Sequence, residues 1–256
     1  MSTKPGETYM KKYMIPFIVG ALLTTGCFSK TANEQKQAEA TRRLGEAYIH
    51  QGEFTQAIQK LSEAEKMNPD DHLTQDNLGI AYMGRKEYDK SIEHFKKAIE
   101  LKSDYAPAIN NLGTVYMDAG KWDDAIACFE KLNDNLIYAT PHYPMANLGW
   151  VYYNKKMYEK SKTCYLKALT YSPNFVKAMR GLAMTYTAMG KNDLAIETLN
   201  KALKISPSIA ELHYEIGEAY YKTGQNEQAA ASFQKAIELG KDRPVVNMAK
   251  KKLEFM

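Results

Sequence analysis

The sequence predicts an all-α fold in which six helix-turn-helix repeats stack into a solenoid and a C-terminal helix caps the last repeat. The first observation behind this prediction is a recurring aliphatic residue, followed by a small residue and, three positions later, a tyrosine. The small residues of the six copies are Gly45, Gly79, Gly113, Gly149, Ala183 and Gly217. Successive copies are 34 residues apart, except for the 36 residues between Gly113 and Gly149. A fixed period of this length indicates a repeat architecture.

The second observation is a matching pattern in the later half of each repeat. Twelve residues after each small residue comes an alanine or serine, and sixteen residues after it comes a leucine or an aromatic residue. These two positions are four apart and therefore lie on one face of a helix. We expect the first small residue to let the two helices approach closely. Because one helix pair cannot bury its apolar face alone, neighbouring pairs must stack.

The third observation is the placement of glycine and proline. A glycine lies at the expected turn between the two helices of four repeats, where a left-handed backbone is often needed; these are Gly52, Gly120, Gly190 and Gly224. Prolines are expected to stop the second helix of three repeats, at Pro69, Pro173 and Pro207.

The pattern L-G-x-x-Y with this period resembles the tetratricopeptide repeat (TPR). The resemblance implies a right-handed TPR superhelix, an α-solenoid with a concave inner groove. The six repeats are expected at 38–71, 72–105, 106–141, 142–175, 176–209 and 210–243 within residues 38–243, and the capping helix at 244–256. The third repeat is two residues longer than the others, and its extra residues fall in 133–143, where Pro141 interrupts a helix.

The N-terminus has the features of a secretory signal. Lys11 and Lys12 precede an apolar run from Tyr13 to Leu23, which is too short for the roughly 20 residues of a membrane-spanning helix. Residues 1–26 are therefore predicted to be a lipoprotein signal peptide. Met10 looks like its natural start, which would make Met1–Tyr9 an over-long start.

Gly26-Cys27 at the end of this run resembles a bacterial lipobox. The resemblance implies that Cys27 is lipidated and becomes the mature N-terminus, with residues 27–37 as the lipidated cysteine and a polar tether. An aspartate after the cysteine usually retains such proteins in the inner membrane. Because Phe28 stands there instead, the expected location is the periplasmic face of the outer membrane, through a lipid anchor.

Composition and motifs argue against other classes of function. The chain has 34 basic and 30 acidic residues and a net charge of +4, so nothing favours a nucleic-acid partner. No phosphate-binding loop, HExxH or GxSxG motif is present, the five histidines lack metal-ligand spacing, and no cofactor is implied. We therefore expect a protein that is not an enzyme.

Cys128 and Cys164 occupy the same place in adjacent repeats. Packed helices lie ~8–10 Å apart, whereas a disulfide needs Cα atoms within ~7 Å. We expect both to be half-buried small apolar side chains without a disulfide between them.

The remaining candidate site is the inner face of the first helix of each repeat. With the small residue numbered as position 8, that helix packs through positions 4, 7, 8 and 11, and positions 2, 5, 6, 9, 12 and 13 lie opposite. Asparagine can clamp an extended backbone, because it donates and accepts, and tyrosine and tryptophan supply large contact areas with few rotors. The candidate residues of this partner-binding groove are Asn77, Asn110, Asn111, Tyr143, Asn147, Trp150, Tyr153, Asn154 and Arg180. The alternative is that the asparagines only satisfy neighbouring helices and the aromatic residues fill the seam between repeats.

Several features together resemble the type IV pilus biogenesis lipoproteins of the PilF, PilW and Tgl kind, which are called pilotins. They are the lipobox, the six repeats and the extended third repeat. Within that repeat, residues 133–149 (NDNLIYATPHYPMANLG) resemble a Leu-Tyr-x-x-Pro stretch followed by an Asn-x-Gly helix start. The resemblance spans Cys27 to about residue 243. It implies an outer-membrane lipoprotein that binds a secretin or another pilus component and promotes secretin assembly. The alternative is a general envelope TPR scaffold, for example one that organises peptidoglycan enzymes.

Overall fold

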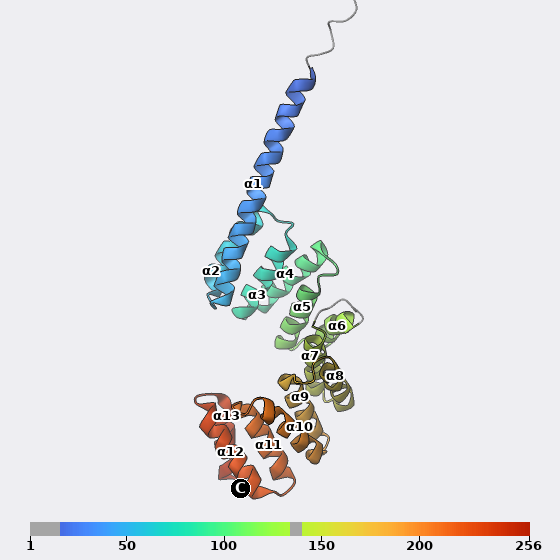
Figure 1. Ribbon diagram of the computed structural model, residues 1–256, viewed down its shortest axis with the longest axis vertical. Coiled ribbons are helices and arrows are strands. Elements are labelled where there is room, and N and C mark those ends of the chain that lie inside the picture. Colours follow the sequence, from blue (N-terminus) through green and yellow to red (C-terminus); the bar gives the residue numbers. More distant parts are fainter. Residues whose placement is uncertain (1–15, 134–139) are drawn as a thin grey trace, which may run out of the picture. The chain divides into compact units, whose positions relative to one another are not determined.

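The computed structural model describes residues 16–133 and 140–256, with side chains for 32–132 and 140–256 (Figure 1). In these residues every element is an α-helix, which confirms the predicted all-α class. The helices are α1 Pro16–His50, α2 Phe54–Met67, α3 His72–Gly84, α4 Tyr88–Leu101, α5 Ala106–Asp118, α6 Trp122–Asn133, α7 His142–Asn154, α8 Tyr158–Tyr171, α9 Val176–Ala188, α10 Asn192–Ile205, α11 Ala210–Lys222, α12 Asn226–Gly240 and α13 Pro244–Glu254.

Several predictions about the N-terminus fall outside the described part of the chain. Residues 1–15, which include Met10 and the lysine pair, are not described, and neither is the side chain of Cys27. The backbone from Pro16 onward belongs to the 35-residue α1, so the expected tether is helical. None of the described helices combines the length and apolar character needed to cross a membrane.

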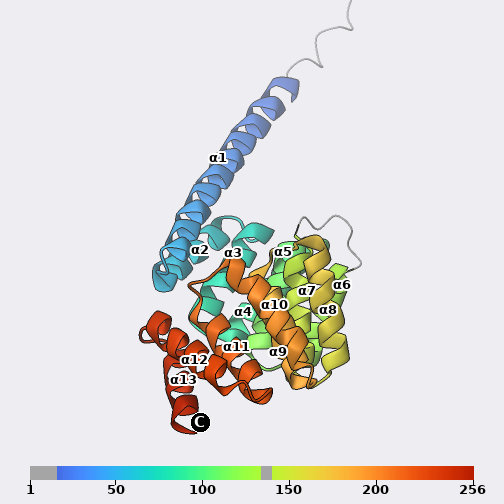
Figure 2. The ribbon, with the colours of Figure 1, turned by 60° about the horizontal axis from the view of Figure 1, so that its bottom comes forward.

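The helices form two compact units, which divide between Ser103 and Asp104. In the first unit, α2 and α3 share a small buried cluster, and Tyr48 and Ile49 of α1 pack against it; the cluster consists of Ala57, Leu61, Leu78 and Ala81. In the second unit, each helix from α6 to α13 packs against the one before it, and Figure 2 shows α7, α8 and α10 grouped together. Stability within each unit therefore comes from contacts between neighbours, as is typical of solenoids.

Close approach of the paired helices depends on the glycine at position 8. A methyl group added at Gly79 would lie 2.6 Å from Cδ1 of Phe95, and one at Gly113 would lie 2.6 Å from Cε1 of Phe129. Both rings are fully buried. The ring occupies the space that a side chain at position 8 would need, which is why the small residue recurs.

The turn between paired helices requires a left-handed backbone in all six repeats. Four copies use glycine, with φ between +72° and +77°, as predicted. The second and fourth repeats place Lys86 and Lys156 at the equivalent position, with φ of 62° and 58°. A lysine in this region is strained by about 1–2 kcal/mol, so packing of the helix pair holds the turn in these two repeats.

The helix ends have local causes. Asp71 caps α3, because its carboxylate accepts hydrogen bonds from the Leu73 amide at 3.1 Å and from the Thr74 hydroxyl at 2.7 Å. Pro107 and Pro244 lie in the first turns of α5 and α13, where the missing amide hydrogen costs nothing.

The last helix covers the sixth repeat, as the sequence predicts. Val245 and Ala249 of α13 are buried in one cluster with Ala210, Phe233 and Ala236 of α11 and α12. The cluster removes apolar surface of the sixth repeat from water, and a fully buried Val or Phe side chain contributes about 1.5–3 kcal/mol.

A double-mutant cycle tests the contact between Gly79 and the Phe95 ring. We expect Gly79→Ala to destabilise the protein by up to about 2 kcal/mol, because overpacking costs about 1–3 kcal/mol and the gain in helix propensity offsets about 1 kcal/mol of it. The double variant Gly79→Ala, Phe95→Leu has the same residue pair as the fifth repeat, where Ala183 and Leu199 occupy the equivalent positions. Those two residues lie in one buried cluster.

Urea unfolding of the wild type, both single variants and the double variant measures the coupling. The double variant should be more stable than the sum of the single effects predicts. Additive effects would show that Gly79 is not small on account of the Phe95 ring.

Candidate functional site

The inner face of α7 carries a stacked aromatic pair. The rings of Trp150 and Tyr153 have centroids 5.6 Å apart and planes inclined by 14°. The ring centroid of Tyr158, at the start of α8, lies 5.8 Å from that of Tyr153. Trp150 and Tyr153 are both half-buried. They form a rigid apolar platform with part of its surface open to a partner.

An ion pair lies beside this platform. Arg180 of α9 donates from Nη2 to Oε1 of Glu215 of α11 at 2.9 Å. Burial raises the pKa of the Glu215 carboxyl, although the Arg180 hydrogen bond and charge act in the opposite direction. The pKa of Tyr153 is also raised, first by burial and then by the Glu215 charge. The platform and the ion pair therefore form one patch across α7, α9 and α11, which we call the inner patch (Trp150, Tyr153, Arg180 and Glu215).

Asn147 makes a contact between two helices. Its side chain is buried, and its Oδ1 accepts a hydrogen bond from Nζ of Lys177 at 3.0 Å. Partial burial lowers the pKa of Lys177, and the charge of Asp118 opposes this shift. This oxygen is thus already used between α7 and α9, which favours the alternative interpretation for Asn147.

The other predicted groove residues are spread over the two units. Asn77 is buried on α3 of the first unit, whereas the residues of the inner patch belong to the second. Asn110 and Asn111 are half-buried on α5.

Tyr143 and Asn154 lie near the two ends of α7. Tyr143 is 46% exposed, and its ring meets the Phe175 ring edge-on with a centroid distance of 5.3 Å. Asn154 is exposed and donates to the Trp150 carbonyl of its own helix at 2.8 Å.

Glu215 was not among the site residues expected from the sequence. It occupies position 6, where three earlier repeats have asparagine, and this change of residue type was the available signal. The partnership with Arg180 joins residues 35 apart in the chain. The repeat period places both on one face but does not determine which side chains meet.

The first unit contains a buried polar network that sequence reasoning also missed. Gln75 of α3 is fully buried, donates to Glu65 of α2 at 2.8 Å, and is hydrogen bonded through Oε1 to Nδ1 of His94 of α4 at 2.8 Å. Lys97 donates to the same Glu65 carboxylate at 2.9 Å. Burial lowers the pKa of His94. The network satisfies polar groups that link three helices, a structural role.

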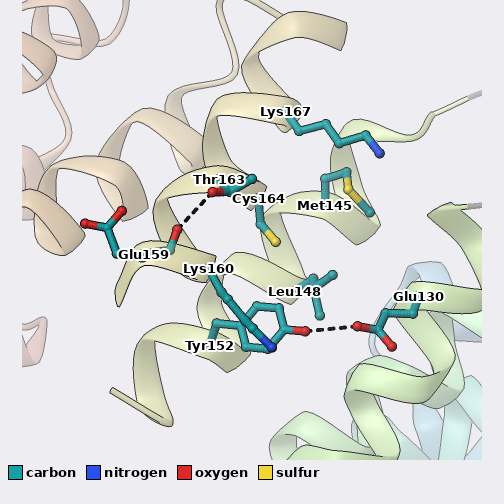
Figure 3. Close-up of a pocket in the computed structure, with 9 residues that line it drawn as sticks. All are labelled: Glu130, Met145, Leu148, Tyr152, Glu159, Lys160, Thr163, Cys164 and Lys167. Atoms are coloured by element: carbon teal, nitrogen blue, oxygen red, sulfur yellow. Dashed lines mark hydrogen bonds between the residues drawn. The ribbon is translucent and has the colours of Figure 1, made fainter. Parts of the chain in front are cut away.

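A hollow of about 470 Å³ lies between α6, α7 and α8 (Figure 3). Its wall includes the Tyr152 hydroxyl, which donates to Glu130 at 3.0 Å, and Lys160, whose Nζ lies 5.3 Å from the Tyr152 ring centroid. Burial raises the pKa of Tyr152 to about 12 and that of Cys164 to about 11. Both groups are therefore protonated at neutral pH, so the thiol does not present a nucleophile.

Cys128 and Cys164 are both half-buried and neither forms a disulfide, as predicted. Within the described residues, no group of three or more histidine, cysteine, aspartate or glutamate side chains is arranged to hold a metal ion.

Comparison with protein families identifies the repeats. Models described as TPR repeat or tetratricopeptide repeat match residues 31–72, 79–120, 108–133, 143–175, 183–224 and 210–243. The matches extend over all six expected repeats. Among curated proteins, none has a sequence that matches this chain.

Solved structures share the fold at low identity. PilW, described as a widely conserved type IV pilus biogenesis factor, is 20% identical with a TM-score of 0.75, over 82% of this chain and 97% of that chain. PilF of Pseudomonas aeruginosa is 17% identical with a TM-score of 0.74, over 86% and 99%. YrrB, described as a TPR protein with an unusual peptide-binding site, is 22% identical with a TM-score of 0.56, over 75% and 97%.

The raised pKa of Glu215 predicts how stability depends on pH. Because the folded pKa lies above the ordinary value, ionised Glu215 opposes folding at neutral pH, and this penalty vanishes below the ordinary pKa, where both states are protonated. Glu215→Gln keeps an acceptor for Arg180. We expect it to melt at or above the wild-type temperature at pH 7, with the difference shrinking toward pH 4.

Glu197→Gln is the control for this thermal measurement. A hydrogen bond from Lys201 lowers the pKa of the exposed Glu197, so its substitution should have a small effect of opposite sign. Loss of stability in Glu215→Gln that is greater at pH 7 than at pH 4 would contradict the assignment.

Proposed function

Since this chain belongs to the tetratricopeptide repeat proteins, we propose that it is a scaffold that binds a protein partner through the inner patch. The observation that carries this proposal is the half-buried stack of Trp150 and Tyr153 beside the ion pair of Arg180 and Glu215. Aromatic and arginine side chains are the types that most often dominate binding energy at protein interfaces.

The inner patch fits an extended peptide. The stacked rings offer a flat apolar surface whose side chains lose little freedom on binding. The Arg180 side chain is 39% exposed, and its hydrogen bond to Glu215 leaves other guanidinium donors for a backbone carbonyl. A peptide could place an apolar side chain on the rings and a carbonyl at Arg180.

For the partner, we propose a secretin subunit or another component of type IV pilus biogenesis. Two lines support this proposal: the sequence resemblance to the pilotins, and the shared fold with PilW and PilF over most of both chains. In this role the protein would promote assembly of the secretin multimer. A general envelope scaffold that organises peptidoglycan enzymes would have the same fold and is the competing outcome of the test below.

The location follows from the same proposal. Lipid on Cys27 would hold the chain at the periplasmic face of the outer membrane, since Phe28 rather than aspartate follows the cysteine. Two or more acyl chains anchor a protein stably, at about 0.8 kcal/mol for each buried CH₂ group.

The detergent-resistant secretin multimer is the first readout. Deletion of the protein should remove the multimer while secretin monomer remains, and Trp150→Ala with Tyr153→Ala should reduce it by at least about tenfold, because a lost hot spot costs ≥ ~2 kcal/mol. Tyr171→Ala is the matched control, since Tyr171 is 51% exposed at the end of α8, outside the inner patch.

Circular dichroism establishes that the variants are folded. An unchanged multimer in the deletion strain would refute the pilotin role and favour the general scaffold. An unchanged multimer in the double variant alone would refute the inner patch as the binding surface.

The lipid anchor has its own test. Cys27→Ser should move the protein from the outer-membrane fraction to the soluble periplasm, because the acyl chains attach only to the cysteine thiol and the new N-terminus. Cys128→Ser is the control and should remain in the membrane fraction. Retention of Cys27→Ser in that fraction would show that another feature anchors the chain.

A further inference from the structure

The inner-face pattern continues past the sixth repeat onto α13. Tyr214 and Tyr221 occupy inner-face positions 5 and 12 of α11, and 34 residues later the chain has Met248 and Phe255. Lys252 also lies 34 residues after Glu218, and the two form an ion pair with Nζ 2.8 Å from Oε1. α13 is therefore aligned with α11 as the first helices of consecutive repeats are, and it extends the inner face besides covering the core.

A second hollow lies where these two helices meet. It has a volume of about 300 Å³, close to the lower limit of ligand pockets. Its lining residues are Tyr214, Tyr221, Met248, Lys251, Lys252 and Phe255, which we call the terminal pocket. Tyr214 is buried, and its ring centroid lies 5.6 Å from that of Phe233, so this wall of the pocket is fixed. The volume of the pocket suits one large side chain.

Two large apolar side chains of the terminal pocket are exposed. Phe255 is 73% exposed and Met248 is 49% exposed. Large apolar side chains that are exposed together indicate an interaction site. Methionine suits such a surface, because its flexible thioether adapts to different partners.

The border of the terminal pocket is positively charged. Lys252 has its charge compensated by Glu218 and lies 5.7 Å from the Tyr221 ring centroid. No carboxylate of the described residues lies within ion-pair distance of Lys250 or Lys251. An acidic group on a partner would therefore gain an ion pair at Lys251 without displacing one already formed.

We propose that the terminal pocket binds an extended protein segment in which aspartate or glutamate flanks a large apolar side chain. The apolar side chain lies between Met248 and Phe255, and a carboxylate pairs with Lys251. This inference rests on the proposed function, because the segment would belong to the partner that the inner face binds. A side-chain-sized hollow with a fixed wall fits such a segment better than a membrane surface, which needs protruding apolar residues on a broad face.

The probe is the peptide acetyl-Gly-Gly-Glu-Phe-Glu-Gly-amide, added to the full chain labelled with ¹³C at methionine methyl groups. The reporter is the Met248 methyl signal, assigned through Met248→Leu. We expect a saturable shift of this signal and an affinity that falls at least about threefold between 50 and 300 mM salt. Lys251→Glu should weaken binding by at least about fivefold, while Lys156→Glu, on a distant turn of the same unit, should leave it unchanged.

Two control peptides test whether binding needs both the acidic and the apolar side chains. Replacing both glutamates by lysine, or the phenylalanine by serine, should abolish the shift. Equal binding of the lysine peptide, or no Met248 shift with any peptide, would overturn the proposal. A Met248 shift caused by phosphatidylglycerol vesicles but not by the acidic peptide would overturn it in favour of a membrane contact.

The outcomes separate this inference from the proposed function. If the acidic peptide leaves Met248 unchanged while the Trp150 and Tyr153 variants lose the secretin multimer, only the terminal pocket fails. If the peptide binds there while those variants assemble the multimer normally, the terminal pocket stands and the inner patch fails.

Discussion

The contact between a glycine at position 8 and a ring or leucine sixteen residues later determines the geometry of the helix pair. At Gly79 and Gly113 the facing phenylalanine ring would lie 2.6 Å from any added methyl group. The first helix must therefore lie with its backbone against the second. Because positions 4, 7, 8 and 11 of the first helix pack in this contact, the positions on the opposite side of that helix can contact other helices or a partner. The candidate binding surface is thus a consequence of how each repeat packs.

One repeat modifies the rule. Tyr165 takes the place of the buried ring in the fourth repeat, and it contacts Gly149 of its own repeat as well as Gly181 of the next. Gly181 occupies position 6, where the three preceding repeats have asparagine, and a methyl group there would overlap the Tyr165 ring. Ser161, one turn earlier on α8, bonds the Gly149 carbonyl at 2.8 Å and the Thr185 hydroxyl at 2.9 Å. The seam from α7 to α9 is therefore held by both a ring and a hydroxyl network, directly behind the inner patch.

Much of the fold could be predicted from the sequence because one period is repeated six times. A pattern such as Gly79 with Phe95 fixes which face of each helix packs, independently of other repeats. The position of Trp150 and Tyr153 on the inner face follows from the same period. The hydrogen bond from Lys177 to Asn147 and the ion pair of Arg180 with Glu215 could not be predicted, since they join residues 30 and 35 apart whose rotamers depend on tertiary packing. For this reason the sequence did not reveal that the side-chain oxygen of Asn147 is hydrogen bonded within the protein.

Site-specific photocrosslinking in cells can show whether a protein partner lies along the inner face. A photoreactive phenylalanine analogue replaces Tyr153 in one strain and Tyr171 in another, so that one probe lies in the inner patch and the other at the end of α8. We expect a crosslink to secretin from position 153 and none from position 171. A secretin crosslink from position 171 and none from position 153 would show that the partner does not lie along the inner face.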